Sequence, residues 1–119
     1  MKKQRICIVG DGLSGLTSAI VLNNILNIEV HLISNKGPKK KDKRTTAISD
    51  SNFNFLRKNI SNFNSKLFWP SKHINLFYET SSQKINFLNF NEVKNNLMYV
   101  LENDKVKKFL LKEIKKKKN

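Results

Sequence analysis

Cysteine is almost absent from this 119-residue sequence: the single residue, Cys7, excludes an internal disulfide and a cysteine metal cluster. A reducing cytoplasm fits that composition. Acidic residues are also scarce, with 9 Asp and Glu against 23 Lys and Arg. The excess charge favours binding to phosphates, anionic lipid or nucleic acid. AT-rich codons for the abundant Lys, Asn, Ile and Phe would produce the same charge without any partner, so both interpretations stay open.

Arginine is scarce even among the basic residues, since only Arg5, Arg44 and Arg57 are present. Proteins that read nucleic-acid bases rely on arginine for bidentate contacts, so direct base readout is not expected. Long apolar runs are lacking as well: Asp11 and three glycines interrupt the stretch 6–26, and no cleavage site follows it. Neither a secretory signal nor a membrane span is therefore predicted. The length allows about one domain with one core.

The pattern of the first 34 residues is strand, glycine turn, helix and strand. Arg5–Val9 is a short apolar run with β-branched residues, which suits a buried parallel strand. Apolar residues then recur at helical spacing from Leu13, which predicts a helix that ends near Asn27. Ile28–Ile33 is expected to form a second strand. The order predicts a βαβ unit.

The turn between the first strand and the helix reads Gly10-Asp-Gly-Leu-Ser-Gly15, a Gly-x-Gly-x-x-Gly motif. Gly10 permits a sharp exit from the strand, Gly12 leaves the backbone open to a pyrophosphate, and Gly15 lets the helix pack closely. Its context between a strand and a helix makes the motif informative. We interpret the turn as a dinucleotide-binding site.

Leu13 and Ser14 begin the helix at this turn, so its free N–H groups and the positive end of its dipole would face the phosphates. Leu16 stands where a P-loop requires lysine, which excludes that class of ATP or GTP site. Ser34 stands at the end of the second strand, where the motif normally has an acidic residue. Its hydroxyl, helped by Asn35, can bond a ribose but does not separate FAD from NAD.

The segment after the second strand resembles a known family. Flavin hydroxylases of ubiquinone biosynthesis carry an Asp-x-Arg-x-x-Ala-Leu-Ser segment there, which Asp42, Arg44, Ala47, Ile48 and Ser49 fit. A helix is expected to follow, with its apolar side formed by Phe53, Leu56 and Ile60.

Two further blocks continue this resemblance in the family's order. Residues 69–77 look like the segment that leads into the family's first substrate-domain strand, and residues 97–103 resemble its Leu-Gly-Tyr-x-Val-Glu-Asn stretch. Met98 replaces the usual glycine there. Val106 and Leu110 fit the helix that follows.

The resemblance implies an α/β fold in which a Rossmann-like FAD-binding unit precedes the beginning of an interleaved, β-rich substrate domain. We expect the βαβ unit at 1–34, a loop and helix at 35–68, substrate-domain strands at 69–96, and a helix with a basic tail at 97–119. Family members are several hundred residues long and carry a Gly-Asp motif downstream. The chain therefore looks like a truncated reading frame, a split gene product or a fragment, and in a split gene the carboxy-terminal portion would be a separate chain.

The function that the resemblance implies is flavin-dependent monooxygenation. NAD(P)H would reduce FAD, and the flavin would use O2 to hydroxylate an aromatic ubiquinone precursor. The chain alone is not expected to have full activity. Arg44 is expected to contact FAD, together with Gly10, Gly12, Leu13, Ser14, Gly15, Ser34 and Asn35. A lipid quinone precursor implies a cytoplasmic protein with transient peripheral contact to the inner face of a membrane.

The remaining chemical residues are predicted to be structural. His31 and His73 each lack the neighbours of a metal site, so no metal is expected. Cys7 is interpreted as a small core residue. Trp69 and Tyr99 are interpreted as packing residues, with the substrate pocket as the alternative for Tyr99.

Glu102 and Asn103 have two interpretations. By family analogy they approach the cofactor, and by their side chains they begin a helix. Two other functions stay open for the whole chain. One is a noncatalytic nucleotide-binding remnant, and the other is a basic module for nucleic acid or anionic membrane, whose active feature would be the lysine runs.

Overall fold

The computed structural model describes residues 2–37 and 40–117, and within them the fold is mixed α/β with its strands in small sheets. This coarse fold class was expected. The described residues leave out Lys39, which is part of the expected lysine run, and the end of the basic tail, Lys118 and Asn119.

The elements are, in chain order, β1 (Gln4–Val9), α1 (Leu13–Asn23), β2 (Ile28–Ile33), β3 (Thr45–Ser49), α2 (Asp50–Asn59), the 3-10 turn η1 (Ser65–Leu67), β4 (Phe68–Ser71), β5 (His73–Glu79), β6 (Lys84–Asn91), β7 (Met98–Glu102) and α3 (Asn103–Lys116).

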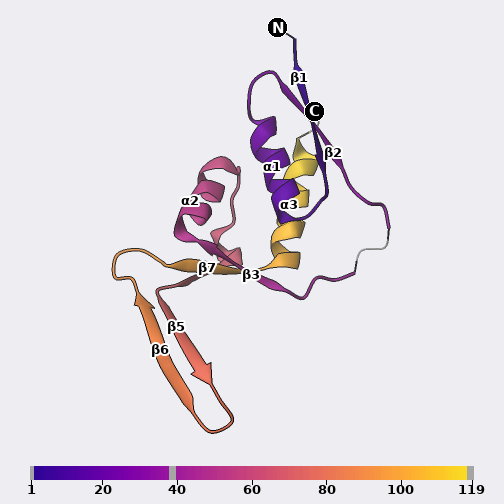
Figure 1. Cartoon of the computed structure of the whole chain (residues 1–119). Helices are drawn as coiled ribbons and strands as arrows, with labels where there is room; N and C mark the ends of the chain where they lie inside the picture. The colour runs from indigo at the N-terminus through magenta and orange to yellow at the C-terminus, as the bar shows by residue number, and fades with distance from the viewer. Residues whose placement is uncertain (1, 38–39, 118–119) are drawn as a thin grey trace.

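The first unit is a pair of parallel strands, β1 and β2, joined through α1 (Figure 1). Their register runs from Gln4 opposite Ile28 to Val9 opposite Ile33. α3 lies beside α1, so segments from opposite ends of the chain share one helical layer. α1 ends at Asn23, earlier than the expected end near Asn27, because the chain turns at Asn24 and Asn27 adopts a left-handed conformation with φ 63°.

Burial of β1 differs from the expectation of a fully buried strand. Ile6 and Ile8 are half-buried, whereas Cys7 is exposed and Val9 is 80% exposed. The expectation that Cys7 is a core residue was wrong. Successive side chains of a strand point to opposite faces, and within the described chain the helices cover only one face of this two-stranded sheet. Cys7 lies on the open face.

The second sheet is antiparallel and brings distant segments together in the order β3-β7-β4. Thr46 is opposite Leu101 and Phe68 is also opposite Leu101, so β7 is the central strand. α2 begins directly after β3, where the Ser49 side chain accepts a hydrogen bond from the Asn52 N–H at 3.2 Å. Such a cap satisfies one of the free N–H groups of a helix start.

The core lies between this sheet and the helices. Phe53 from α2 stacks on Tyr99 with ring centroids 3.7 Å apart, and it meets Phe63 and Phe68 edge to face. Tyr99 is therefore a packing residue, as expected. Trp69 is not, because its position on β4 leaves it 49% exposed with the Lys105 ammonium 6.0 Å from its ring. The buried apolar residues of this cluster are Leu16, Ile20, Phe53, Ile60, Phe68, Leu101, Val106 and Leu110.

The third sheet is a hairpin of β5 and β6 that projects from the rest of the molecule (Figure 1). It gives the chain a long axis of 64 Å against 37 and 23 Å across. All of β6 is exposed. The hairpin therefore lies outside the core.

Candidate functional site

The glycine turn after β1 has a separate constraint at each glycine. Gly10 has φ +111°, a left-handed conformation that favours glycine, and its N–H donates to the Ile33 carbonyl at 2.8 Å. A Cβ at Gly15 would lie 2.1 Å from the Gly10 carbonyl oxygen, so no side chain fits there. A Cβ at Gly12 would meet nothing within 4 Å. The turn is thus tight at Gly10 and Gly15 and open at Gly12.

The start of α1 at this turn lacks a side-chain cap. Gly12 is the N-cap residue, its carbonyl accepts from the Leu16 N–H at 3.0 Å, and the first turn carries no acidic residue. Helix starts concentrate positive potential and N–H groups that an anion can satisfy. Gly12 therefore leaves this helix start accessible to a ligand.

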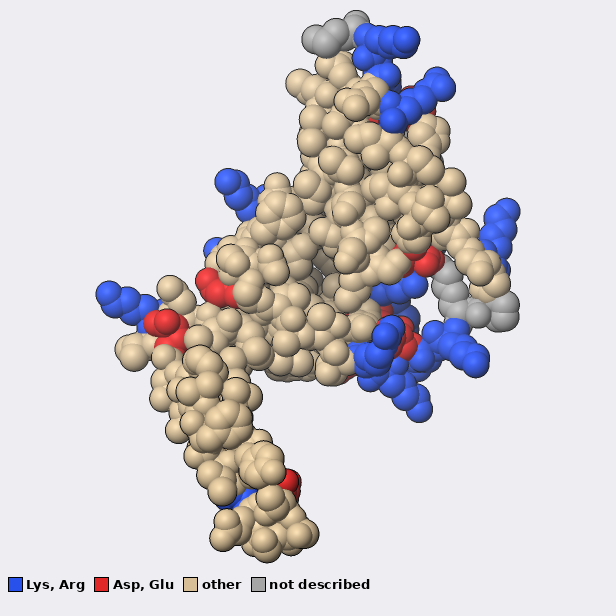
Figure 2. Space-filling view, viewed as in Figure 1, with Lys and Arg blue, Asp and Glu red and all other residues tan. Residues whose placement is uncertain are grey.

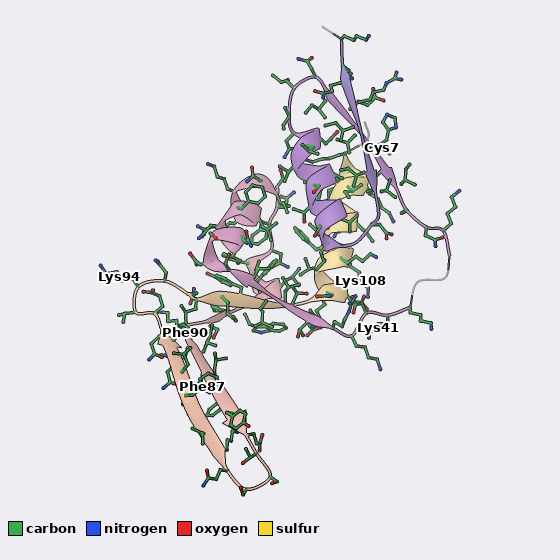
Figure 3. All side chains as sticks on the ribbon, viewed as in Figure 1. Cys7, Lys41, Phe87, Phe90, Lys94 and Lys108 are labelled. Carbon is green, nitrogen blue, oxygen red and sulfur yellow. The ribbon has the colours of Figure 1, made fainter. Side chains whose placement is uncertain are left out.

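A cavity of about 710 Å³ lies against the turn. Its walls come from the glycine turn, the loop that precedes β3, and the first half of α3. Five basic side chains line it against three acidic ones, so its formal charge is positive. Figure 3 labels Lys41 from the loop and Lys108 from α3, both on this side of the molecule. The charged lining residues are Asp11, Lys40, Lys41, Asp42, Arg44, Asp104, Lys107 and Lys108.

Asp11 within the glycine turn forms an ion pair with Lys107 of α3. The Lys107 Nζ lies 3.6 Å from the Asp11 carboxylate, and both side chains are largely covered, at 27% and 19% exposed. The pair reduces the repulsion that the Asp11 carboxylate would exert on a bound anion. It also connects the start of α1 to α3.

Asp42 and Arg44 form a bidentate pair beside the cavity. The Arg44 Nε donates to one Asp42 oxygen at 2.9 Å, and its second guanidinium nitrogen donates to the other at 3.0 Å. Together with the Asn103 amide, these donors hold the pKa of Asp42 well below its ordinary value, and the same pairing raises the pKa of Arg44. Arg44 is 82% exposed. Its guanidinium is therefore charged and oriented while it still contacts solvent.

Asn103 fixes the position of this pair. Its amide nitrogen donates to Asp42 at 3.2 Å, and its amide oxygen accepts from the Thr46 hydroxyl at 2.6 Å. Asn103 is buried and is the first residue of α3, and its N–H donates to the Arg44 carbonyl at 3.1 Å. The interpretation that Asn103 begins a helix is confirmed. Glu102 is the N-cap residue and its side chain does not cap the helix.

The predicted cofactor residues fall into two groups. Gly12, Leu13, Ser14 and Arg44 line the cavity. The other four do not: Gly10 and Gly15 shape the turn, and Ser34 and Asn35 lie exposed beyond β2, where the Asn35 Oδ1 accepts from the Gly37 N–H at 3.1 Å.

The sequence interpretation missed the lysines of α3. Lys107 and Lys108 reach the cavity because β3 pairs with β7, which brings the start of α3 against a loop about sixty residues earlier. No local pattern signals that proximity. Lys40 and Lys41 were interpreted as part of an exposed run, and they are exposed while also lining the cavity.

A second, apolar cavity of about 490 Å³ adjoins the first. Leu13 and Ser14 line both, and Ile48, Phe55 and Phe109 are among the apolar side chains of the second. Tyr99 does not line it. The glycine turn therefore separates a charged space from an apolar one.

The histidines bond to single neighbours. The His31 ring lies 2.7 Å from the Glu29 carboxylate, and the His73 ring lies 2.7 Å from the Asn91 amide oxygen. Within residues 2–37 and 40–117, no group of three or more His, Cys, Asp or Glu side chains could hold a metal ion. None of the helices in the described part of the chain is long and apolar enough to cross a bilayer.

No family model and no curated protein matches the sequence.

Proposed function

We propose that the chain binds FAD and is the amino-terminal portion of a flavin-dependent aromatic hydroxylase of the ubiquinone-biosynthesis type, built on a Rossmann-like unit. One observation carries the proposal: the open Gly12 lies at an uncapped helix start that faces a positively charged cavity. Diphosphates bind at such helix starts after the first strand of a βαβ unit.

The residues present fit a diphosphate. Gly12 leaves room for the phosphate oxygens, and the N–H groups at Leu13 and Ser14 belong to the first turn of α1. Arg44 offers guanidinium N–H groups beyond those bonded to Asp42, and lysines on two walls balance the ligand's charge. The cavity volume lies within the range of cofactor sites.

The ribose end of the cofactor would run along the ends of β1 and β2. The two parallel strands end side by side, where the Gly10 N–H bonds the Ile33 carbonyl. Ligands of open α/β sheets bind at the carboxyl ends of the strands. Ser34 and Asn35 follow β2 there, and their exposed side chains would bond the ribose hydroxyls.

When bound, FAD would supply the redox chemistry, with NAD(P)H as the transient reductant and O2 and an aromatic quinone precursor as substrates. The residues of this chain hold the cofactor and neutralise its phosphates. A lipid precursor would imply peripheral contact with a membrane.

The test is a titration of the purified chain with FAD, followed by flavin fluorescence and thermal melting. We expect saturable binding with a rise in melting temperature, because a ligand that binds only the folded state stabilises it. The Gly12→Asp variant should lose FAD binding by at least about tenfold, since a carboxylate would repel the diphosphate. Asp is a favoured N-cap residue, so this variant should fold at least as stably.

The matched control is Asn86→Asp, which adds the same carboxylate on the exposed strand β6, outside the cavity. It should bind FAD like the unaltered chain. If FAD changes neither flavin emission nor melting behaviour, the proposal is wrong. Because the chain alone is not expected to have full activity, FAD binding is the result that tests the proposal. NAD(P)H oxidation in the presence of O2 would in addition argue against a noncatalytic nucleotide-binding remnant.

A further inference from the structure

The β5–β6 hairpin carries an apolar strip on one face. Residues that are opposite each other in an antiparallel pair share a face, and alternate residues along each strand share it too. Three cross-strand pairs form the apolar strip: Ile74 with Phe90, Leu76 with Leu88, and Tyr78 with Ile85. The register shifts between Leu76 and Phe77, where the extra residue Phe87 has no opposite residue, and this shift keeps Ile85 on the face of Leu88.

The opposite face of the hairpin is polar near its base. Asn75 is opposite Asn89 and His73 is opposite Asn91, with the His73 ring nitrogen 2.7 Å from the Asn91 amide oxygen. Further from the base this face also carries Phe77, which is opposite Asn86 and 49% exposed, with the Lys84 ammonium 4.7 Å from its ring. The alternation near the base is typical of a sheet that buries one face and exposes the other to water. The sequence of the hairpin is therefore suited to a covered apolar strip.

The apolar strip is nevertheless exposed in the single chain. Its largest exposed fractions are 60% at Tyr78, 48% at Ile85, 45% at Phe90 and 42% at Leu88. An isolated two-stranded hairpin is marginally stable in water, and a contiguous apolar patch of this kind marks an interaction site. We therefore expect another surface, the cover, to pack on the apolar strip.

The charges of the hairpin and of the whole chain indicate which kind of surface packs on the apolar strip. Between His73 and Asn91 the charged residues are Glu79 and Lys84, which are opposite each other and cancel. The whole chain has a formal charge of +14, and Figure 2 shows its basic side chains mainly on the rest of the molecule. An acidic partner would be attracted to the body and not to the hairpin. The cover of the strip is therefore itself apolar and uncharged.

We propose that the cover is a second copy of this chain, with the two apolar strips packed face to face about a twofold axis. A twofold interface uses one self-complementary patch, which an uncharged apolar strip provides. The hairpin projects at one end of a 64 Å molecule, so the two basic bodies would lie at opposite ends. Their separation would far exceed the screening length of about 8–10 Å. This inference does not depend on FAD binding.

The size of the strip predicts a weak dimer. Five side chains of the strip, all except Ile74, are about half exposed and would each bury on the order of 100 Å², which gives roughly 500 Å² per copy and about 1,000 Å² in total. That area is at the lower limit for specific interfaces, so we expect a dissociation constant on the order of micromolar.

Sedimentation of the full chain over concentrations from about 1 to about 100 µM tests this inference. We expect a monomer–dimer equilibrium across that range, in keeping with a micromolar constant. Leu88→Asn, in the middle of the strip, should weaken the dimer by about tenfold or more. Asn89→Ser on the opposite face is the matched control and should leave the equilibrium unchanged. High salt should not weaken the dimer, because the strip is uncharged.

A second measurement covers the case in which Leu88→Asn unfolds the hairpin. In a Cys7→Ser background, Leu88→Cys should form a cross-linked dimer on mild oxidation, and Asn89→Cys should not. Equal cross-linking of both variants would overturn the inference. So would a chain that stays monomeric at every concentration, including one that binds neutral lipid vesicles through the hairpin, because lipid would then be the cover.

Discussion

At the scale of single residues, Gly12 and Gly15 belong to one turn but differ in the space that a side chain would have. Gly15 is required by the fold, because its Cα lies against the Gly10 carbonyl, whereas space is left open at Gly12. The motif alone predicts close packing at Gly15 and an open backbone at Gly12, and the space around each residue agrees with that prediction. The structure shows a steric constraint at Gly15 and open space at Gly12.

Gly15→Ala should therefore destabilise the chain. The added Cβ would lie 2.1 Å from the Gly10 carbonyl oxygen, so α1 and β1 would have to move apart. We expect the free energy of unfolding, measured in urea, to fall by about 2–3 kcal/mol. Gly12→Ala is the control: its Cβ meets nothing within 4 Å, and the change should stay within about 1 kcal/mol. Equal losses in both variants would contradict this assignment.

The pKa of Asp42 predicts a pH dependence. Because Arg44 lowers this pKa in the folded chain, the pairing stabilises the fold above the unfolded-state pKa of about 4 and is lost as pH falls further. Asp42→Asn should therefore show a smaller drop in melting temperature between pH 7 and about pH 3 than the unaltered chain. The difference should be modest, because Arg44 is exposed to solvent. Identical drops would show that Asp42 has no part in the acid sensitivity.

At the scale of elements, the start of α3 fastens the loop before β3. Asn103 accepts from Thr46 of β3 and donates to Asp42 of the loop. The Asp42 N–H in turn donates to Asp104 at 3.1 Å. These bonds hold the wall of the cavity that contains Arg44.

Asn103→Ala should loosen that wall. The change leaves the Thr46 hydroxyl without its acceptor in a partly buried place, so we expect the free energy of unfolding to fall by about 1–3 kcal/mol. Hydrogen exchange of the Arg44 and Thr46 amides should also speed up. Asn86→Ala, on the exposed hairpin, should change the free energy of unfolding by less than about 0.5 kcal/mol. Unchanged exchange at Arg44 would contradict the fastening role.

Local sequence patterns predicted where helices and strands form better than they predicted which of their side chains are buried. The strand before Gly10 and the helices at Leu13 and Phe53 follow from apolar periodicity and glycine, which act over a few residues. The exposure of Cys7 and Trp69 could not be predicted, because it depends on how many strands and helices cover each sheet.

The part of the candidate site that is local in sequence was predicted, and the part that depends on long-range pairing was not. The glycine motif is continuous in sequence, so the turn and its neighbours were found. The contribution of Lys107 and Lys108 depends on the pairing of β3 with β7, and single-sequence patterns do not specify such long-range pairing.

At the scale of the whole molecule, repulsion between the many positive charges works against a fold that buries little apolar surface. The chain combines a formal charge of +14 with a small core and an uncovered hairpin. Self-repulsion of this size destabilises a compact state. Screening this repulsion with salt should therefore raise the melting temperature of the chain.

Raising sodium chloride from about 0.05 M to about 0.5 M should increase the melting temperature by a few degrees, because salt screens repulsion between exposed charges. Potassium chloride at equal concentration is the control and should give the same shift. A melting temperature that falls with sodium chloride would contradict the repulsion argument.

The order β3-β7-β4 also has a consequence for biosynthesis. Both outer strands of this sheet leave the ribosome before the central strand that joins them, since β7 begins at Met98. β3 and β4 therefore stay unpaired while the 48 and 26 residues that separate them from β7 are synthesised, and during that time their edges are open to association with other nascent chains. Cellular yield of this polypeptide should thus depend on chaperones that hold emerging chains.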